Sequence, residues 1–278
     1  EEVEELVKTA LDCGINFFDH ADIYGGGKSE ELFGQVLEKH PEYREKMIIQ
    51  TKCAIVPGKR YDFSKEYIIN AVNGSLKRLH TDHVEILLLH RPDALCDPQE
   101  VAEAFDELYV SGKVKYFGVS NHTPGQIALL QKYTKHPIII NQLQLSIVHS
   151  VMIDSGMNMN MKEDFAIDKD GGVLDYCRLN DITIQAWSIV QASWAEGTFL
   201  NHPDYKKLNN VLDDLAKKYN VTPATIATAW ILRHPAHIQA ITGTTSPKHL
   251  IETAEAANIE LTRQEWYDLY LASDKPLP

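Results

Sequence analysis

Apolar residues recur along the chain with helical and strand periods in alternation. Residues 1–13 predict an amphipathic helix whose apolar face is Val3, Leu6, Val7, Ala10 and Leu11. A short strand follows at Phe17-Phe18, and the glycine run at 25–27 predicts a loop after it. Further strands are expected at residues 47–52, 85–90, 116–121, 138–143, 183–188 and 239–244. Helices are expected at residues 29–39, 171–179 and 262–271 and after the caps Ser64, Asp97, Thr123 and Ser246, and two more cover about 208–233 with a break at 220–223. Long loops are expected at residues 146–170 and 189–207.

Strands that alternate with helices predict a parallel sheet, because only a crossover connection returns the chain to begin a parallel neighbour. The pattern contains seven strands, and no change of composition marks a domain boundary. We therefore expect one domain over residues 1–278, an α/β protein with a (β/α)8 TIM barrel whose first strand is missing from this sequence. An open, doubly wound sheet is the alternative, although no G-x-G-x-x-G follows the first strand.

Composition narrows the possible partners. The 278 residues are 44% hydrophobic and carry a formal net charge of −12. Such a chain lacks the basic surplus that displaces counterions from a phosphate backbone, so we expect no nucleic-acid partner. No apolar run approaches the roughly 20 residues of a membrane span, and we expect no signal peptide. The four cysteines are far apart with no C-x-x-C spacing, which favours a cytoplasmic protein without disulfides or a zinc site.

A polar residue stands at the end of each of several successive apolar strands. A single polar residue at such a place could be a cap, but a succession of them is typical of one site. In a barrel, the C-terminal ends of the strands carry the active site. The residues at these positions are Asp19, Lys52, His90, Ser120-Asn121, Gln142 and Ser188.

Tyr24, in the loop after Asp19, is the candidate proton donor. A neighbouring ammonium at Lys52 would stabilise the phenolate that remains when the tyrosine gives up its proton. Asp19 would keep Lys52 charged and in place, and His90 could donate to a carbonyl oxygen on which negative charge develops. Each residue also has a structural alternative: a strand-end cap, a lysine that reaches solvent, or a histidine satisfied in the core. Together the four predict a proton-donating pocket for a carbonyl.

No metal site is expected. His20, Asp22 and His90 lack the H-E-x-x-H or paired-histidine spacing of metal ligands. Residues 168–172 resemble the start of a calcium loop but lack its remaining ligands. Residues 27–29 end like a phosphate-binding loop, yet Asp22 stands where that motif needs glycine.

The strand-end residues lie in short motifs whose order is highly specific, although each is weak alone. The motifs are Asp19-His20-Ala21-Asp22-Ile23-Tyr24-Gly25, Thr51-Lys52, Leu89-His90-Arg91-Pro92-Asp93, Gly118-Val119-Ser120-Asn121, Asn141-Gln142, Ala186-Trp187-Ser188 and Ile241-Thr242-Gly243-Thr244-Thr245. With them the chain resembles, over essentially its whole length, the aldo-keto reductase family, and within it the bacterial NADPH-dependent oxidoreductases. The resemblance implies a barrel that reduces aldehydes and ketones with NADP(H), with Tyr24 as general acid supported by Lys52 and Asp19, and His90 orienting the carbonyl.

The resemblance also implies the residues that hold the cofactor. Ser120, Asn121 and Gln142 would hold the nicotinamide carboxamide, and Trp187 would stack on its ring. Ser188 and the following loop, with Val190 and Gln191, would cover the pyrophosphate. The adenosine half would be held by Gly243, Thr244, Thr245, Lys248, His249 and Glu252.

The sequence departs from the family pattern at several of these places. His20 replaces a small hydroxyl residue, but strand alternation should point it away from Asp19. His249 replaces the arginine that usually binds the 2′-phosphate, and Thr253 replaces an asparagine, so we expect a weaker preference for NADPH over NADH. The loop after Trp187 is also less rich in glycine than is common.

Two other functions stay open. Lys52 could form a Schiff base with a carbonyl substrate, as a lyase lysine does. The chain could also be a regulatory subunit that binds NADPH with little turnover. The expected partner is a small carbonyl compound, with the protein a monomer or a weak homo-oligomer. The loops at 146–170 and 189–207, which would shape the pocket, carry no readable substrate signature.

Overall fold

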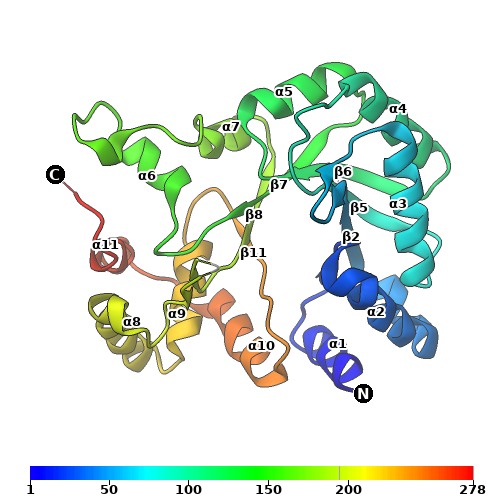
Figure 1. Ribbon diagram of the computed structural model, residues 1–278. Helices are drawn as coiled ribbons and strands as arrows, with labels where there is room; N and C mark the ends of the chain where they lie inside the picture. The colour runs from blue at the N-terminus through cyan, green and yellow to red at the C-terminus, as the bar shows by residue number, and fades with distance from the viewer. Residues whose placement is uncertain (194, 278) are drawn as a thin grey trace. The chain divides into compact units, whose positions relative to one another are not determined.

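The structure is a computed structural model that describes residues 1–193 and 195–277 (Figure 1). It divides into two compact units, which are treated separately below. Unit 1 comprises Glu1–Gln142 and Leu179–Ile182, and unit 2 comprises Leu143–Arg178 and Thr183–Pro278.

Unit 1 alternates strands with helices, as the apolar pattern predicts. Its elements are α1 (Glu2–Asp12), β1 (Phe17–Asp19), the 3-10 turn η1 (Tyr24–Gly27), α2 (Lys28–Lys39), η2 (Pro41–Lys46), β2 (Ile48–Cys53), the hairpin β3 (Ile55–Val56) and β4 (Arg60–Tyr61), α3 (Lys65–Arg78), β5 (Val84–Leu89), α4 (Pro98–Val110), β6 (Val114–Ser120), α5 (Pro124–Tyr133) and β7 (Ile138–Gln144). The parallel strands follow the order β1-β2-β5-β6-β7. This order follows the chain without reversal, so unit 1 lacks the switch point of a doubly wound sheet.

Local signals explain where these helices begin. The side chains of Ser64, Asp97 and Thr123 each accept a hydrogen bond from a backbone N–H in the first turn of α3, α4 and α5. Thr123 forms a full capping box with Gln126. In Figure 1, α2, α3 and α4 lie along the outer side of β2, β5 and β6, and α4 buries Val101, Ala104, Phe105 and Leu108.

Gly118 allows β6 to lie close to its neighbours. A Cβ at this position would come 2.6 Å from Leu88 Cδ2 and 2.8 Å from the carbonyl oxygen of Ile140. The β6–β7 register shifts at the same place, between Phe117 and Val119. Beyond the shift, Ser120 pairs with Gln142. Glycine is therefore needed where the bulge brings these two strand ends together.

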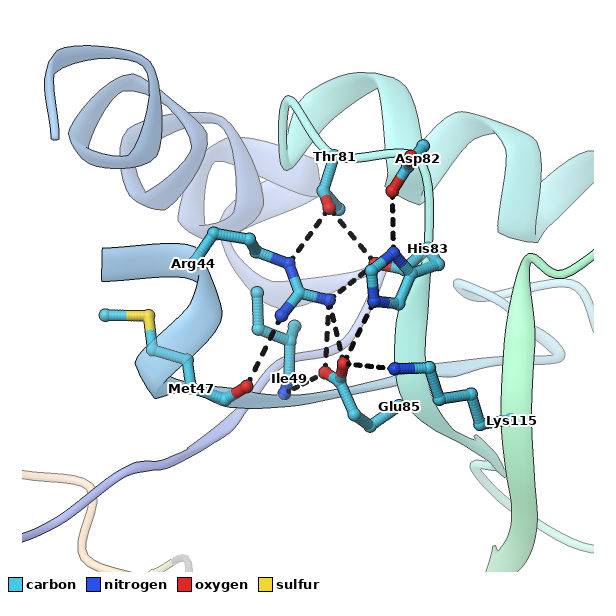
Figure 2. Close-up of polar contacts among 8 residues, drawn as sticks. All are labelled: Arg44, Met47, Ile49, Thr81, Asp82, His83, Glu85 and Lys115. Carbon is cyan, nitrogen blue, oxygen red and sulfur yellow. Dashed lines mark hydrogen bonds and ion pairs between the residues drawn. The ribbon is translucent and has the colours of Figure 1, made fainter. Parts of the chain in front are cut away.

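An ionic network around Glu85 joins the N-terminal ends of β2, β5 and β6 (Figure 2). Its carboxylate accepts from Arg44 Nη2 at 3.0 Å, Ile49 N at 2.8 Å and Lys115 Nζ at 3.3 Å. Burial opposes ionisation of Glu85, but the hydrogen bonds from Ile49 and Arg44 lower its pKa. Glu85 and Ile49 follow the first residues of β5 and β2, so this network lies away from the polar C-terminal ends of the strands.

Unit 2 continues with α6 (Val151–Met157), η3 (Asp164–Ala166), α7 (Val173–Leu179), β8 (Thr183–Trp187), the hairpin β9 (Gln191–Ser193) and β10 (Gly197–Thr198), η4 (Pro203–Tyr205), α8 (Lys206–Tyr219), α9 (Pro223–Leu232), β11 (Gln239–Ala240), α10 (Pro247–Ala254), η5 (Glu255–Asn258) and α11 (Arg263–Ala272). β8 and β11 are parallel. The indole rings of Trp230 and Trp266 stack with their centroids 4.7 Å apart, and each ring N–H donates to the backbone carbonyl of the other residue. This double contact fixes α9 against α11.

Three expectations for unit 2 are wrong in detail. The segment 146–170 contains α6, which is too short to show a clear helical period. The segment 189–207 contains the β9–β10 hairpin, whose strands of three and two residues are too short to show an alternation of apolar and polar residues. The last strand stops at Ala240, not at residue 244. Its ladder ends with Ile241 N donating to the carbonyl of Ala186, after which the Thr244 hydroxyl accepts from Ser246 N.

Among the described residues, no helix is both long and apolar enough to cross a membrane. Nor does this part of the chain bring three or more His, Cys, Asp or Glu side chains together as metal ligands.

Candidate active site

The ammonium of Lys52 is the centre of the candidate site in unit 1. The side chain lies near the end of β2 and is 0% exposed. Its Nζ donates to Asp19 Oδ2 at 2.6 Å, to the His20 carbonyl oxygen at 2.9 Å and to Tyr24 Oη at 3.2 Å. These acceptors use all three protons of an ammonium group. The ion pair with Asp19 compensates for the loss of water around the charge.

The strand register explains why Asp19 meets Lys52. Asp19 pairs with Gln50 across β1 and β2. Because side chains alternate along a strand, Gln50 and Lys52 point to the same side, toward the carboxylate. Gln50 Nε2 donates to Asp19 Oδ1 at 2.5 Å, and Gln142 Nε2 donates to the same oxygen at 3.1 Å. One carboxylate oxygen is thus bound by a cation and the other by two amides.

His90 lies beside Tyr24. The two rings pack edge to face, with centroids 5.8 Å apart and planes at 82°. Burial, and then the positive charge of Lys52, lower the pKa of His90 to about 3, so its imidazole is neutral at pH 7. Its Nδ1 is buried and has no hydrogen-bond partner among the described residues. Tyr24 is 37% exposed, so its ring is open to solvent on one side. The structure thus brings the four predicted catalytic residues together.

A second polar group lies at the ends of β6 and β7. Ser120 Oγ donates to the carbonyl of Gln142 at 2.9 Å and accepts from Asn121 Nδ2 at 2.8 Å. Asn121 has a φ of 57°, in the left-handed region that asparagine tolerates. Asn141, fully buried, donates through Nδ2 to the carbonyl of His122 at 3.0 Å. The three predicted nicotinamide residues of unit 1 are therefore joined, and Asn141 holds the turn beside them.

In unit 2, Trp187 ends β8 and Ser188 begins the turn that leads to β9. Ser188 has a φ of 57° and donates through Oγ to Gln191 Oε1 at 3.0 Å. The carbonyl of Val190 accepts from the Thr198 hydroxyl at 2.7 Å. The predicted pyrophosphate residues are thus held by a hairpin.

The remaining predicted cofactor residues of unit 2 lie just before α10 or within it: Gly243, Thr244, Thr245, Lys248, His249 and Glu252. Ser246 caps the helix by accepting from His249 N. Lys248 Nζ lies 3.8 Å from Glu252 Oε1, and the lysine side chain is 81% exposed. The imidazole of His249 is also exposed, so two side chains that can carry positive charge stand in the first turn.

Sequence reasoning missed a buried ionic group beside the site. Glu30, in the first turn of α2, is 0% exposed. Its Oε1 accepts from the Thr51 hydroxyl at 2.5 Å, and its Oε2 lies 2.8 Å from Arg78 Nε. Burial, and then the charge of Glu30, raise the pKa of the nearby Asp22 carboxyl to about 7. A glutamate in the first turn of a helix has an ordinary explanation in the helix dipole, so nothing local indicates these partners.

His20 behaves as its place in the strand predicts. Its ring packs on Phe33 of α2, with centroids 4.4 Å apart, and so lies away from the Asp19 carboxylate. Burial lowers the pKa of His20 to about 4. Its contribution to the site is the backbone carbonyl that binds Lys52.

Comparison with known proteins shows the family of this chain. The model of the Aldo/keto reductase family matches residues 1–270. The chain belongs to the aldo-keto reductase family. It is 36% identical over 278 residues to a 6-dehydroglucose reductase of Novosphingobium aromaticivorans, covering 97% of this chain and 84% of that protein. Among solved structures, the thermostable aldo-keto reductase Tm1743, in complex with the inhibitor epalrestat, matches with a TM-score of 0.77 at 27% identity, over 98% of this chain and 87% of that one.

An aldo-keto reductase from Klebsiella pneumoniae, in complex with NADPH, matches with a TM-score of 0.76 at 22% identity, covering 100% of this chain and 87% of that chain. These matches confirm the predicted family, the (β/α)8 barrel fold and an oxidoreductase of the aldo-keto reductase type. Residue roles and the substrate stay predictions.

Proposed function

We propose that this aldo-keto reductase reduces an aldehyde or ketone to the alcohol and that Tyr24 gives the proton to the substrate oxygen. The observation that carries the proposal is the 3.2 Å contact between Tyr24 Oη and the fully buried ammonium of Lys52. As the hydroxyl loses its proton, negative charge develops on Oη, and the ammonium stabilises that charge. Asp19, 2.6 Å from Nζ, keeps the lysine charged and aimed at the tyrosine.

His90 is proposed to orient the carbonyl. Its neutral imidazole carries one ring N–H, which can donate to the carbonyl oxygen without giving up a proton. Because its ring edge packs against Tyr24, an oxygen that approaches the tyrosine hydroxyl also comes near the histidine. Tyr24 is then the acid, and His90 sets the direction of approach.

The chemistry of the predicted cofactor residues fits NADP(H). The cofactor supplies the hydride. Ser120, Asn121 and Gln142 offer a hydroxyl and two amides, which complement the donor and acceptor of a carboxamide. Trp187 offers a flat apolar face for the nicotinamide. The capped start of α10, with exposed Lys248 and His249 side chains, suits an anion such as the 2′-phosphate.

The contacts of Lys52 argue against the Schiff-base alternative. A lysine nucleophile attacks as the free amine. Here Nζ donates to three acceptors, one of them a carboxylate at 2.6 Å, and the side chain is 0% exposed, so Nζ is not open to attack a substrate carbonyl. The regulatory-subunit alternative differs only in turnover, so a steady-state assay separates it.

The similarity to a 6-dehydroglucose reductase suggests a more specific substrate class, a sugar that carries an aldehyde. We include 6-dehydroglucose with simple aliphatic and aromatic aldehydes in the test panel. A kcat/KM for the sugar well above those of the simple aldehydes would support this assignment, and the reverse order would oppose it.

The test of the proposed function measures NADPH oxidation with this panel for the parent and for Tyr24→Phe. The variant keeps the ring and removes the hydroxyl, so cofactor binding should survive while reduction falls by a factor on the order of 10²–10⁴. Tyr116→Phe, at a tyrosine that is 53% exposed on β6, is the matched control and should reduce at the parent rate. Tyr24→Phe turning over like the parent would show that another group is the acid.

We also propose that residues 1–278 behave as one domain, in a cytoplasmic setting, as a monomer or weak homo-oligomer. The boundary between the two units falls inside β7, after Gln142, whereas separate domains are normally joined by exposed linkers. Cys13, Cys53 and Cys96 are free thiols, which suits a reducing compartment. A single cooperative unfolding transition, seen alike by fluorescence and circular dichroism, would support the one-domain proposal.

A further inference from the structure

The turn that carries Tyr24 is held by short-range backbone hydrogen bonds, from Tyr24 N to the Ala21 carbonyl at 3.1 Å and from Gly26 N to the Ile23 carbonyl at 3.0 Å. It is a 3-10 turn in which Gly25, Gly26 and Gly27 have φ values of 57°, 64° and 94°, all in the left-handed region. Glycine adopts this region freely, but such a segment also has many other conformations to occupy. The Tyr24 ring is 37% exposed and packs only in part. The position of the tyrosine hydroxyl therefore depends on where the ends of the turn are anchored.

One anchor joins the start of the turn to β2. Asp22 N donates to the carbonyl oxygen of Lys52 at 3.0 Å, which ties the backbone before Tyr24 to the lysine itself. This contact lies before Tyr24 and does not reach the glycine end of the turn.

The other anchor is the side chain of Arg78, the last residue of α3. Gly27 is buried against it, and a Cβ on Gly27 would come 3.1 Å from Arg78 Cδ and 3.2 Å from Nε. These distances are shorter than an ordinary van der Waals contact of 3.4–4 Å. The turn can therefore lie this close to the arginine only because position 27 carries no side chain.

Arg78 is itself held firmly. Its Nε and Nη2 each lie 2.8 Å from Glu30 Oε2, and Nη2 donates to Ser75 Oγ at 3.2 Å. Glu30 is fully buried and is bound through its other oxygen by Thr51, the residue before Lys52 in β2. The same group of contacts therefore reaches both the strand that carries the lysine and the turn that carries the tyrosine.

We propose that Arg78 is a positioning residue for Tyr24: fixed by Glu30, it supports the glycine turn so that the tyrosine hydroxyl stays beside Lys52. Arg78 acts through the backbone at Gly27 and does not touch the reacting atoms. The proposal rests on Tyr24 being the proton donor. It goes beyond that assignment by naming the residues that keep the donor in place.

A pair of alanine substitutions in the turn tests the proposal. Gly27→Ala and Gly26→Ala both place alanine in left-handed backbone, but only the first puts a methyl group against Arg78, since a Cβ on Gly26 meets nothing within 4 Å. Because Glu30 and Ser75 hold the arginine, the turn and not Arg78 should shift. An ångström-scale displacement of a catalytic group can lower a rate by about 10²-fold. Because this contact calls for a shift of only a few tenths of an ångström, single-turnover reduction by Gly27→Ala should fall by a factor of roughly 3–10, with the Kd for NADPH unchanged, while Gly26→Ala stays near the parent rate.

A second pair tests the arginine itself. Arg78→Lys keeps a charge for Glu30 but loses the planar fork that both binds the carboxylate and supports Gly27. Arg44→Lys makes the same chemical change in the Glu85 network at the other ends of the strands. Both should lower the unfolding temperature. Only Arg78→Lys should lower the single-turnover rate, and reduction by Arg44→Lys should match the parent.

A crystal structure of Gly27→Ala gives a readout that does not depend on activity. The distance between Tyr24 Oη and Lys52 Nζ should exceed the 3.2 Å of the parent. An unchanged distance, or equal rates for the two glycine variants, would overturn the positioning role. If the parent reduced no carbonyl at all, the proposed function would fail, and this distance would still decide whether Arg78 positions the turn.

Discussion

Lys52→Met is the most informative single substitution, because it separates the stability of the site from its chemistry. Methionine keeps most of the side-chain length and removes the charge. Asp19 is then left as a buried carboxylate with a side chain only 9% exposed. Removing one member of a buried ion pair usually costs about 3–5 kcal/mol, mainly because the other charge is left uncompensated.

The structure places the expected cost at the lower end of that range. Asp19 keeps two amide donors, Gln50 Nε2 at 2.5 Å and Gln142 Nε2 at 3.1 Å. Hydrogen bonds to a charged group contribute about 1.5–3 kcal/mol each, so they offset part of the lost attraction. We expect the free energy of unfolding of Lys52→Met to fall by about 3 kcal/mol. Reduction should fall by a factor on the order of 10²–10⁴, because Tyr24 loses the cation that stabilises its phenolate.

The double variant Lys52→Met/Asp19→Asn is the control. It removes both charges, and asparagine can still accept from the two glutamine amides. Its stability should recover to within roughly 1 kcal/mol of the parent, as measured by urea unfolding. Its single-turnover rate with a good aldehyde should stay as low as that of Lys52→Met. Recovery of reduction in the double variant, or a near-parent rate in Lys52→Met, would refute the role given to the ammonium.

Three further predictions concern cofactor choice and pH. His249→Arg should increase the ratio of the NADH Kd to the NADPH Kd by about 10-fold, because guanidinium can bind the 2′-phosphate through two hydrogen bonds and carries a permanent charge. An unchanged ratio in fluorescence titrations would show that this residue does not contact the phosphate. Burial lowers the pKa of both His20 and His122 to about 4, so below the unfolded value of about 6.5 the unfolded chain binds more protons. Their contribution to stability is complete above that pH and is lost as the pH falls toward 4, and His122→Gln should flatten this part of a urea-unfolding pH profile. The pKa of Asp22 is raised to about 7, so the contribution of Asp22 to stability is complete below its unfolded pKa and is lost as the pH rises through 7. The free energy of unfolding of Asp22→Asn, measured relative to the parent, should therefore be more favourable at pH 8 than at pH 5. An equal difference between variant and parent at both pH values would contradict the assignment.

Much of unit 1 can be predicted from the sequence because its signals are local. The capping residues Ser64, Asp97 and Thr123 start helices where expected, since each bonds a backbone N–H within its own first turn. The residues that end the strands are equally clear, because a polar side chain after an apolar run needs no knowledge of distant contacts. Asp19 and Lys52 could be placed together from strand order alone.

The short elements of unit 2 could not be predicted with the same success. The β9–β10 hairpin is too short for a strand period to stand out from a loop. The end of β11 depends on where its ladder with β8 stops, which is a property of two segments and not of one.

By itself, then, the sequence determined the order of helices and strands, the caps that begin the helices, and the polar residues at the strand ends. Only the tertiary structure decided which of those residues touch and what surrounds them. In the sequence, Gln50 is only one residue of a mostly apolar strand. The register of β2 with β1 and the pleat of β2 direct its amide toward Asp19. Glu30 and Arg78 are 48 residues apart in the chain. They meet because α2 and α3 cover neighbouring strands, and burial then leaves each charge in need of the other.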